Sequence, residues 1–372
     1  MEPVTHFLTG ACIGRSGFNR RTAYATLAAT LAAEAPDLDV LWAFGGPVVS
    51  LMHHRGITHT LIATPFMALA VTGFVWLIHR AATRIRKPRM TEPQPVRWLW
   101  IYVAAFIAHL SHLLLDWTNN YGLRPFFPFN ARWYSGDLVF IADPIIWGLL
   151  LAALIFPALL SLADREVGAR RTRFRGRAWA IMALSGMVIL WCWRWAEHAS
   201  ARNLVEAAQV TPTPARRISL EPYPLSPFRW HALIETDTTW QIAEVDTRRG
   251  LVDSDARTDS LFKSPITPAV EVARRTRLGQ VYLDWSQWPV VRDMGQMTVP
   301  KSPPAGFPQG RQWTSVEFSD LRFAYAYLDT NMAGSTQQKL DQMLTQSGIS
   351  GWVYVLDNRE EAGQFLNGKE QK

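Results

Sequence analysis

Three side chains that can bind a metal ion lie at the end of an apolar stretch of the sequence. His109, His112 and Asp116 fall within about 60° of one another if residues 98–115 form an α-helix. Ionisable groups in an apolar segment of this length are costly unless they are paired, solvated or bound to a metal ion. Neutral imidazole and carboxylate groups suit zinc, and also manganese or iron. The pattern therefore predicts a divalent metal site on this helix.

Residues of the same chemical types occur in four other stretches of the chain. Two stretches lie within the first 40 residues. A third directly precedes the apolar run that begins at Leu61, and the aspartates of the fourth lie on either side of the start of the run at Phe140. Together with a neighbouring arginine they are His6, Asp37, Asp39, His53, His54, Arg55, His59, Asp137 and Asp143.

The histidines also have other interpretations. A single histidine on an apolar face is more often a hydrogen-bonded core residue, and this holds for His53 and His54 taken singly. Transmembrane haem also uses paired histidines, but usually from facing helices near the middle of the membrane. The spacing of His112 and Asp116, with aspartates nearby, instead favours a hard or borderline metal. We expect no organic cofactor.

The aspartates and the arginine are open to structural interpretations as well. Asp37 and Asp39 suit the start of a helix as capping residues, and Asp143 precedes a proline in the same manner. Arg55 suits an anionic substrate and a lipid headgroup equally well. These alternatives remain open at the level of sequence.

Four apolar segments are long enough to cross the hydrocarbon core of a membrane. About 20 helical residues cover the roughly 30 Å that a span requires. Trp and Tyr residues gather at several segment ends, as they do at membrane interfaces. The segments are Leu61–Ile78, Trp98–Leu115, Phe140–Leu162 and Ala178–Trp195.

The excess positive charge lies in two loops between these segments. The chain has a formal net charge of +7, yet loops 80–97 and 164–177 hold twelve basic and three acidic residues, so the remainder is slightly negative. This distribution indicates membrane topology and gives no reason to expect nucleic-acid binding. With four crossings both loops share one side, which the positive-inside rule makes cytoplasmic. The five His and Asp stretches are then expected together on the outer face.

The first 50 residues are predicted to form a short helical hairpin. Thr5–Gly14 and Ala23–Ala35 are apolar but too short to span, and three arginines lie between them. Such a hairpin places His6 beside Asp37 and Asp39, with the arginine turn pointing away.

A change of composition near residue 200 predicts a second domain. We expect a membrane-embedded helical domain over 1–200, a Pro-rich linker over 201–227 and a small β-rich extracytoplasmic domain over 228–372. The fold class is thus a membrane α-helical bundle with about four spanning helices, an N-terminal short helical hairpin and a C-terminal β-rich soluble domain. The runs that indicate this β-rich domain are Trp230–Val245, Gly279–Trp285, Trp313–Leu328 and Gly351–Leu356, with a helix expected over Ser335–Gln346.

Four motifs in a fixed order resemble the YdjM-like (YbcI-type) family of LexA-binding, inner-membrane-associated, membrane-bound metal-dependent hydrolases. The resemblance covers roughly residues 1–200, and 226–230 resemble the start of the family's soluble tail. Thr60 stands where the family often has Ser, and the long second half leaves the role of 220–372 open. The motifs are Thr5-His6 with Gly10, Pro36–Asp39, Arg55–Thr60, and His109–Asp116 followed by Tyr121-Gly122.

The resemblance implies a bacterial inner-membrane protein with a hydrolytic metal centre, distantly similar to the zinc-dependent phospholipase C and single-strand nuclease group. Metal-activated water would attack a phosphoester or ester, and a site at the membrane surface favours a lipid or other amphipathic substrate. The residues assigned on this basis are His6, Asp39, His59, His112 and Asp116 as metal ligands, and Asp37, Arg55 and Asp137 as catalytic groups.

A non-catalytic protein is the alternative. Its metal would be structural, and its β-rich domain would bind a partner or the cell envelope. A transporter is less favoured because the sequence shows no inverted repeat. Membrane lipid is an expected contact in every case, and the sequence does not indicate the oligomeric state.

Overall fold

The computed structural model describes residues 1–85, 94–166, 176–254, 259–297, 312–323, 349–357, 360–366 and 369–371. The chain forms two compact units. The first comprises Met1–Asp39, Arg55–His198 and Pro222–Pro227, and the second comprises Val40–His54, Ala199–Glu221 and Phe228–Lys372.

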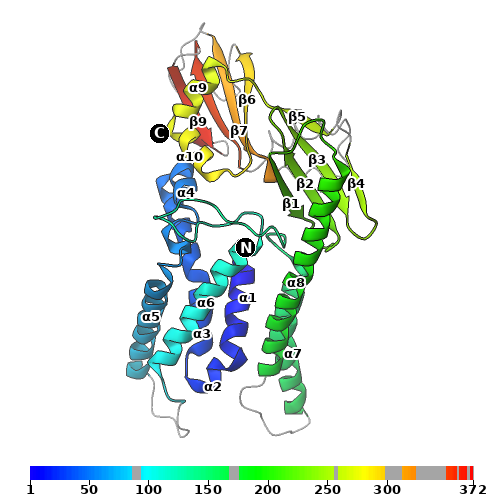
Figure 1. The fold of residues 1–372 in the computed structure, drawn as a ribbon. Coiled ribbons are helices and arrows are strands. Elements are labelled where there is room, and N and C mark those ends of the chain that lie inside the picture. Colours follow the sequence, from blue (N-terminus) through cyan, green and yellow to red (C-terminus); the bar gives the residue numbers. More distant parts are fainter. Residues whose placement is uncertain are drawn as a thin grey trace. The chain divides into compact units, whose positions relative to one another are not determined.

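Four helices among the described residues are long and apolar enough to cross a membrane, with shorter helices before them (Figure 1). The first unit contains three of the four and the fourth as far as His198. The predicted fold class is confirmed: four candidate spans, an N-terminal hairpin and antiparallel sheets further along the chain. The long helices are α5 (Thr64–Ile85), α6 (Trp98–Thr118), α7 (Pro144–Glu166) and α8 (Arg177–Ala208).

The N-terminal hairpin consists of two closely packed helices. Helices α1 (Pro3–Ile13) and α3 (Ala25–Glu34) are joined by the π-helix η1 (Gly14–Phe18) and the short α2 (Asn19–Arg21). A Cβ atom added to Gly10 would lie 2.7 Å from the Ala29 carbonyl oxygen. The absence of a side chain at Gly10 therefore allows α1 and α3 to approach closely.

Helix α6 lies at the centre of the first unit and contacts α1, α3 and α5. The contact surfaces are rich in alanine, which lets helix backbones approach and fixes their relative positions. Four buried alanines of α3 pack here against three of α6 and against α5. They are Ala28, Ala29, Ala32 and Ala33 of α3, and Ala104, Ala105 and Ala108 of α6.

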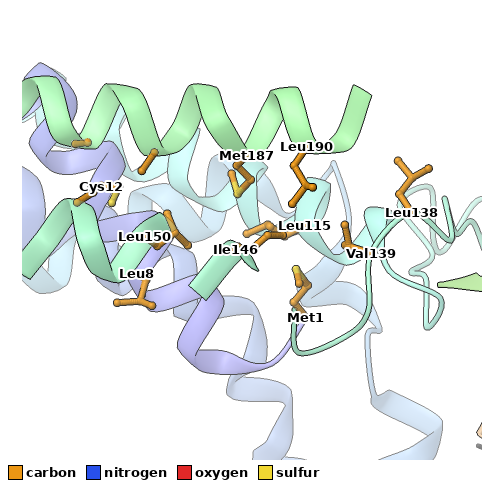
Figure 2. Close-up of a cluster of buried hydrophobic side chains, with 13 residues drawn as sticks. Met1, Leu8, Cys12, Leu115, Leu138, Val139, Ile146, Leu150, Met187 and Leu190 are labelled. Carbon is orange, nitrogen blue, oxygen red and sulfur yellow. The ribbon is translucent and has the colours of Figure 1, made fainter. Parts of the chain in front are cut away.

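A second apolar cluster joins α1, α6, α7 and α8 (Figure 2). Leu115, which precedes Asp116 on α6, is fully buried in this cluster. Beside it, the buried Arg194 of α8 pairs with Asp143 at 3.1 Å, and Asp143 also accepts hydrogen bonds from the backbone N–H groups of Ile145 and Ile146. Asp143 therefore caps α7 and neutralises a buried arginine.

The second unit contains two antiparallel sheets, each with five strands among the described residues. In the first sheet β1 (Arg217–Pro222), β2 (Arg229–Glu235), β3 (Thr239–Asp246) and β4 (Leu251–Asp253) lie in order, and β5 (Ser260–Phe262) pairs with β3. The second sheet has the order β10 (Lys369–Gln371), β9 (Glu360–Leu366), β8 (Gly351–Leu356), β7 (Trp313–Asp320) and β6 (Pro289–Met297).

Helices α9 (Pro268–Arg275) and α10 (Arg277–Trp285) pack on the second sheet. The expectation of a strand over 279–285 was wrong, because these residues form most of α10. The Thr276 hydroxyl accepts a hydrogen bond from the Gly279 N–H and caps this helix. The same unit includes helix α4 (Pro47–His53), which contacts α10.

The range 201–227 is not an extended linker throughout. It contains the last turns of α8, up to Ala208, and the strand β1. The predicted helix over 335–346 and the end of the predicted strand, 324–328, lie outside the described residues.

The close packing of α1 on α3 yields a first prediction. Replacing Gly10→Ala should destabilise the protein by about 1–3 kcal/mol, because the added methyl group forces the helices apart. Gly148→Ala is the matched control, since a Cβ on this glycine of α7 meets nothing within 4 Å. Denaturant unfolding in detergent measures both variants; equal stability of the two would contradict this packing.

The buried pair of Asp143 and Arg194 yields a second prediction. Replacing Arg194→Met leaves the Asp143 carboxylate buried and unpaired, and should cost about 3 kcal/mol. The double variant Asp143→Asn with Arg194→Met removes both charges and should recover most of this loss. A double-mutant cycle in the same unfolding assay gives the coupling free energy between the two residues. If the effects of the two changes are additive, the pair contributes nothing to the free energy of unfolding.

Candidate metal centre

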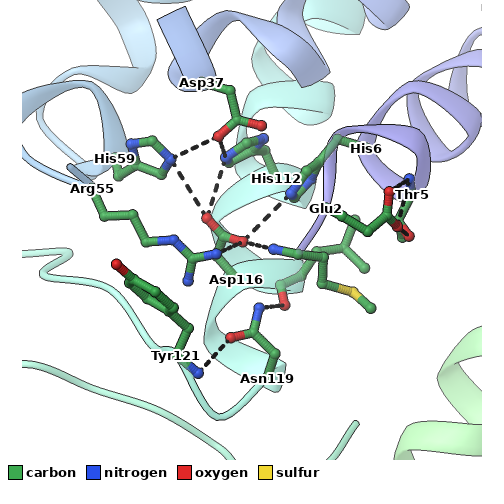
Figure 3. Close-up of polar contacts among 12 residues, drawn as sticks. Glu2, Thr5, His6, Asp37, Arg55, His59, His112, Asp116, Asn119 and Tyr121 are labelled. Atoms are coloured by element: carbon green, nitrogen blue, oxygen red, sulfur yellow. Dashed lines mark hydrogen bonds and ion pairs between the residues drawn. The ribbon is translucent and has the colours of Figure 1, made fainter. Parts of the chain in front are cut away.

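Four segments of the first unit bring histidine and aspartate side chains together (Figure 3). One residue comes from α1, two come from the start of the 3₁₀-helix η2 (Ala35–Gly45), two from residues 55–59, which include η3 (Ile57–His59), and two from the end of α6. They are His6, Asp37, Asp39, Arg55, His59, His112 and Asp116.

Two imidazoles and two carboxylates form the centre of this cluster. Asp37 Oδ1 lies 3.4 Å from His59 Nε2 and 3.7 Å from His112 Nε2. Asp116 Oδ2 lies 3.5 Å from His59 Nε2 and 3.3 Å from His112 Nε2. Each carboxylate oxygen thus faces both rings across similar distances, as the dashed lines in Figure 3 show.

The orientation of His112 fixes the position of its proton. Its Nδ1 lies 2.6 Å from the carbonyl oxygen of Ala33, and an atom that faces a carbonyl oxygen at this distance must donate. In the neutral ring Nε2 then carries a lone pair. Nε2 is buried and has no hydrogen-bond partner within the described part of the chain. A lone pair therefore points at two carboxylate oxygens.

Asp116 is held by positive groups on its other oxygen. Asp116 Oδ1 pairs with the guanidinium of Arg55 at 2.9 Å and also contacts the α-amino group of Met1. Arg55 itself donates to the Gly122 carbonyl oxygen at 2.5 Å, and its guanidinium lies 4.4 Å from the ring centre of Tyr121. These contacts hold Oδ1 and leave Oδ2 facing the two rings.

Asp39 lies on the far side of His59 from the centre. Its Oδ2 accepts the backbone N–H of Arg55 at 2.7 Å and is 3.5 Å from His59 Nδ1. Thr58 Oγ1 is 3.1 Å from the same ring nitrogen. Asp39 therefore connects η2 to the loop that carries His59, and it contacts the ring nitrogen that points away from the cluster.

His6 adds a further imidazole beside the centre. Its Nε2 is 3.4 Å from Asp116 Oδ1, and its ring stacks on that of His112 with centroids 3.7 Å apart. Two groups of side chains in the described residues have ligand atoms close enough for one metal ion. They are His6 with Asp37 and His112, and His59 with His112 and Asp116.

Other residues singled out in the sequence lie elsewhere or have other contacts. Asp143 caps α7, as one of its two interpretations predicted. His53 stacks on Trp42 within the second unit. His109 is buried on α6 but belongs to neither group of possible ligands in the described residues. Asp137 lies in the loop before α7 with φ of 51°, and its catalytic role stays a prediction.

Two glutamates near the cluster were missed by the sequence reasoning. The Glu2 carboxylate accepts hydrogen bonds from the Thr5 N–H and from the Trp147 indole. Burial, and then the charges of Asp37 and Glu2, raise the pKa of Glu34 to about 7. The position of Glu34 three residues before Asp37, at the end of an apolar helix, was the available signal.

Comparisons with known proteins agree with the motifs in the first half of the chain. The family model of the YdjM inner membrane protein matches residues 1–201. The uncharacterized protein YfhP of Bacillus subtilis (strain 168) is 28% identical over 162 residues, which are 41% of this chain and 45% of the relative. The match thus spans less than half the length of that relative. No solved structure matches the chain.

The family match covers the whole of the region that carries the cluster, from His6 to Asp116. It includes more than half of the 372 residues. The chain therefore belongs to the family of the YdjM inner membrane protein.

Proposed function

We propose that this protein is a membrane-bound, metal-dependent hydrolase that cleaves a phosphoester or carboxylic ester at the membrane surface. The observation that carries the proposal is the convergence of His112 Nε2, His59 Nε2 and two carboxylate oxygens in a buried position. Among borderline divalent metals zinc suits these ligands best, with manganese or iron as alternatives.

The four distances fit a metal site better than a hydrogen-bonded cluster. Charge-assisted N–H···O contacts are about 2.7–2.9 Å long, whereas the four measured separations are 3.3–3.7 Å. Zinc bonds of about 2.0–2.2 Å in a tetrahedron separate each of the six pairs of ligand atoms by about 3.3–3.6 Å, and the four His–Asp pairs are close to this range. Buried acceptor atoms that face one another also repel unless a cation or proton lies between them.

We assign one ion to the group of His59, His112 and Asp116. Asp37 is added as a fourth ligand because its Oδ1 lies 3.4 Å from His59 Nε2 and 3.7 Å from His112 Nε2. His112 offers a single lone pair, so the two overlapping ligand groups cannot each use it for a separate ion. This assignment differs from the roles expected from the sequence. His6 is not a ligand of this ion, because its Nε2 faces the other oxygen of Asp116, at 3.4 Å. Asp37 becomes a ligand, and Asp39 becomes a positioning residue that acts on His59 through Nδ1.

A bound divalent ion would lower the pKa of a coordinated water molecule and so supply the nucleophile. The chain's own groups hold the ligands in place. Arg55 fixes Asp116 and is itself fixed by Gly122 and Tyr121, so its charge is used for positioning. Asp37 has a side chain that is 25% exposed, whereas those of His59, His112 and Asp116 are fully buried. Substrate would therefore approach from the side of Asp37.

We further propose that the centre faces the outer side of the inner membrane and that the second unit is periplasmic. The support is the positive charge of loops 80–97 and 164–177, which the positive-inside rule assigns to the cytoplasm. Asp116 lies at the opposite end of α6 from loop 80–97.

A structural metal site is the second candidate. The full burial of three ligands favours it, because structural zinc sites are closed and catalytic sites keep a position for water. The β-rich unit would then bind a partner.

The ligand set yields a third prediction, on metal content. Detergent-purified protein should hold about one metal ion per chain, and Asp116→Ala and His112→Ala should retain almost none, because each loses a buried ligand. His53→Ala is the control, since His53 stacks on Trp42 in the other unit. Elemental analysis measures the metal content per chain. Equal metal content in Asp116→Ala and in the control would contradict the proposal.

The activity itself is tested with the metal-loaded protein. Phosphodiester, phospholipid and carboxylic ester substrates should include one that is hydrolysed, and Asp116→Ala should abolish this hydrolysis. Bound metal without turnover of any substrate would favour the structural candidate.

The different positions of Asp37 and Asp39 yield a fourth prediction. Asp39→Asn should weaken metal affinity by about 10–100-fold and leave the site intact, as loss of an orienting carboxylate does. Asp37→Asn should weaken it further, because a coordinating oxygen loses its charge. Competition with a chelator measures both affinities. A larger loss for Asp39→Asn than for Asp37→Asn would reverse the two roles.

A further inference from the structure

Exposed apolar side chains occupy two loops beside the candidate metal centre. One loop contains Ile57, Leu61 and Ile62, and the other contains Phe126 and Phe129. We call these five residues the apolar rim. Phe129 is 83% exposed, and the other four are also exposed.

The apolar rim is tied directly to the proposed ligands. Ile57 begins the 3₁₀-helix that ends at His59, and Leu61 follows His59 by two residues. The Leu61 N–H donates to the Pro125 carbonyl oxygen at 2.9 Å, which joins the two loops. All five residues belong to the first unit, as does the metal centre. The apolar rim and the candidate metal centre therefore belong to the same compact unit.

The apolar rim exposes an apolar surface, which is unfavourable in water. Every exposed residue within 55–63 is apolar, and the exposed residues within 121–130 are Phe126, Pro128, Phe129 and Asn130. None of them is charged, although loops in water normally expose polar and charged groups. The first exposed charged residue after them is Arg132. A contiguous exposed apolar surface marks an interaction site.

The surface that α5 presents to lipid continues into the rim. Phe66 and Leu69 are exposed on α5, and the exposed Ile62 lies two residues before this helix begins at Thr64. At the other loop, α6 ends at Thr118, two residues after Asp116, so the centre lies where a candidate span ends. Both observations place the rim at the boundary between hydrocarbon and headgroups.

We propose that the apolar rim inserts into the lipid bilayer, so that the metal centre takes an amphiphile with an acyl chain directly from the membrane. The insertion is independent of catalysis, whereas the choice of substrate rests on the proposed hydrolase function. Lipid is the occupant that the continuity with α5 favours, and a second copy of the chain is the rival occupant.

Fluorescence quenching by spin-labelled lipids tests the insertion in the full-length protein. Cys192 is exposed and is replaced by serine, and Cys12 is buried and stays. A fluorophore on Phe129→Cys is compared with one on Arg249→Cys, a matched position whose side chain is 78% exposed on a charged turn. The protein is reconstituted in phosphatidylethanolamine and phosphatidylglycerol vesicles that carry a nitroxide near the top of the acyl chain.

The label at position 129 should be quenched roughly twofold or more above the control label, because interfacial apolar groups reach about 5–10 Å below the headgroup boundary. Aqueous iodide should quench mainly the control. Equal lipid quenching of both labels, with iodide reaching position 129, would overturn insertion. Protection of position 129 from both quenchers in cross-linkable dimers would assign the rim to a second copy.

Substrate comparison separates this inference from the hydrolase proposal. The double variant Phe126→Ser with Phe129→Ser changes only the loop that carries no ligand. It should keep its metal and its rate on a short-chain soluble ester, and should lose at least about tenfold in rate on a vesicle lipid, since two interfacial anchors are removed. Equal rates on the vesicle lipid would contradict lipid uptake through the rim. If wild-type protein lacks metal but its rim is quenched, the hydrolase proposal fails and the insertion stands.

Discussion

The Nδ1 proton of His112 is donated to the backbone of the neighbouring helix α3, and the chemistry of the candidate metal centre depends on this hydrogen bond. With Nδ1 bound to the Ala33 carbonyl oxygen, Nε2 has no proton to offer to the carboxylates that it faces. Buried acceptors without partners cost about 1–3 kcal/mol each, and more when they are charged. A divalent cation among the Asp37, His59, His112 and Asp116 side chains would convert this repulsion into bonding, and this constraint is the reason why we propose a metal centre.

The fold places these groups by two means. Small residues on α1, α3 and α6 set the helix spacing, so His6 and Ala33 lie beside His112 without a flexible loop between them. Charged groups outside the centre then fix the ligands: Arg55 holds Asp116, and Asp39 holds the loop of His59. Because four separate segments supply the side chains, binding of an ion would be coupled to their correct association.

Much of this arrangement was accessible from sequence because helical periodicity is regular. The i, i+4 spacing of His112 and Asp116 placed both on one face of α6, and apolar length gave the four candidate spans. The different roles of Asp37 and Asp39 could not be predicted from the sequence. Both lie in the 3₁₀-helix η2, where side chains two residues apart point in different directions. The stripe also included His109, but His109 lies about 10 Å from Asp116 along the helix axis at about 1.5 Å per residue, which is too far for one ion.

Helix capping and packing contacts, which composition does not reveal, explain the remaining differences between the predicted and the observed secondary structure. Residues 279–285 alternate like a strand, but the Thr276 cap and the contacts of α10 with the sheet stabilise a helix. Prolines around 212–227 indicated a linker, although Pro222 is tolerated as the last residue of β1.

X-ray absorption spectroscopy of the purified, metal-bound protein tests the central claim most directly. The account predicts a first coordination shell of nitrogen and oxygen at about 2.0–2.2 Å, with the scattering of two imidazole rings. A shell without imidazole scattering would contradict it.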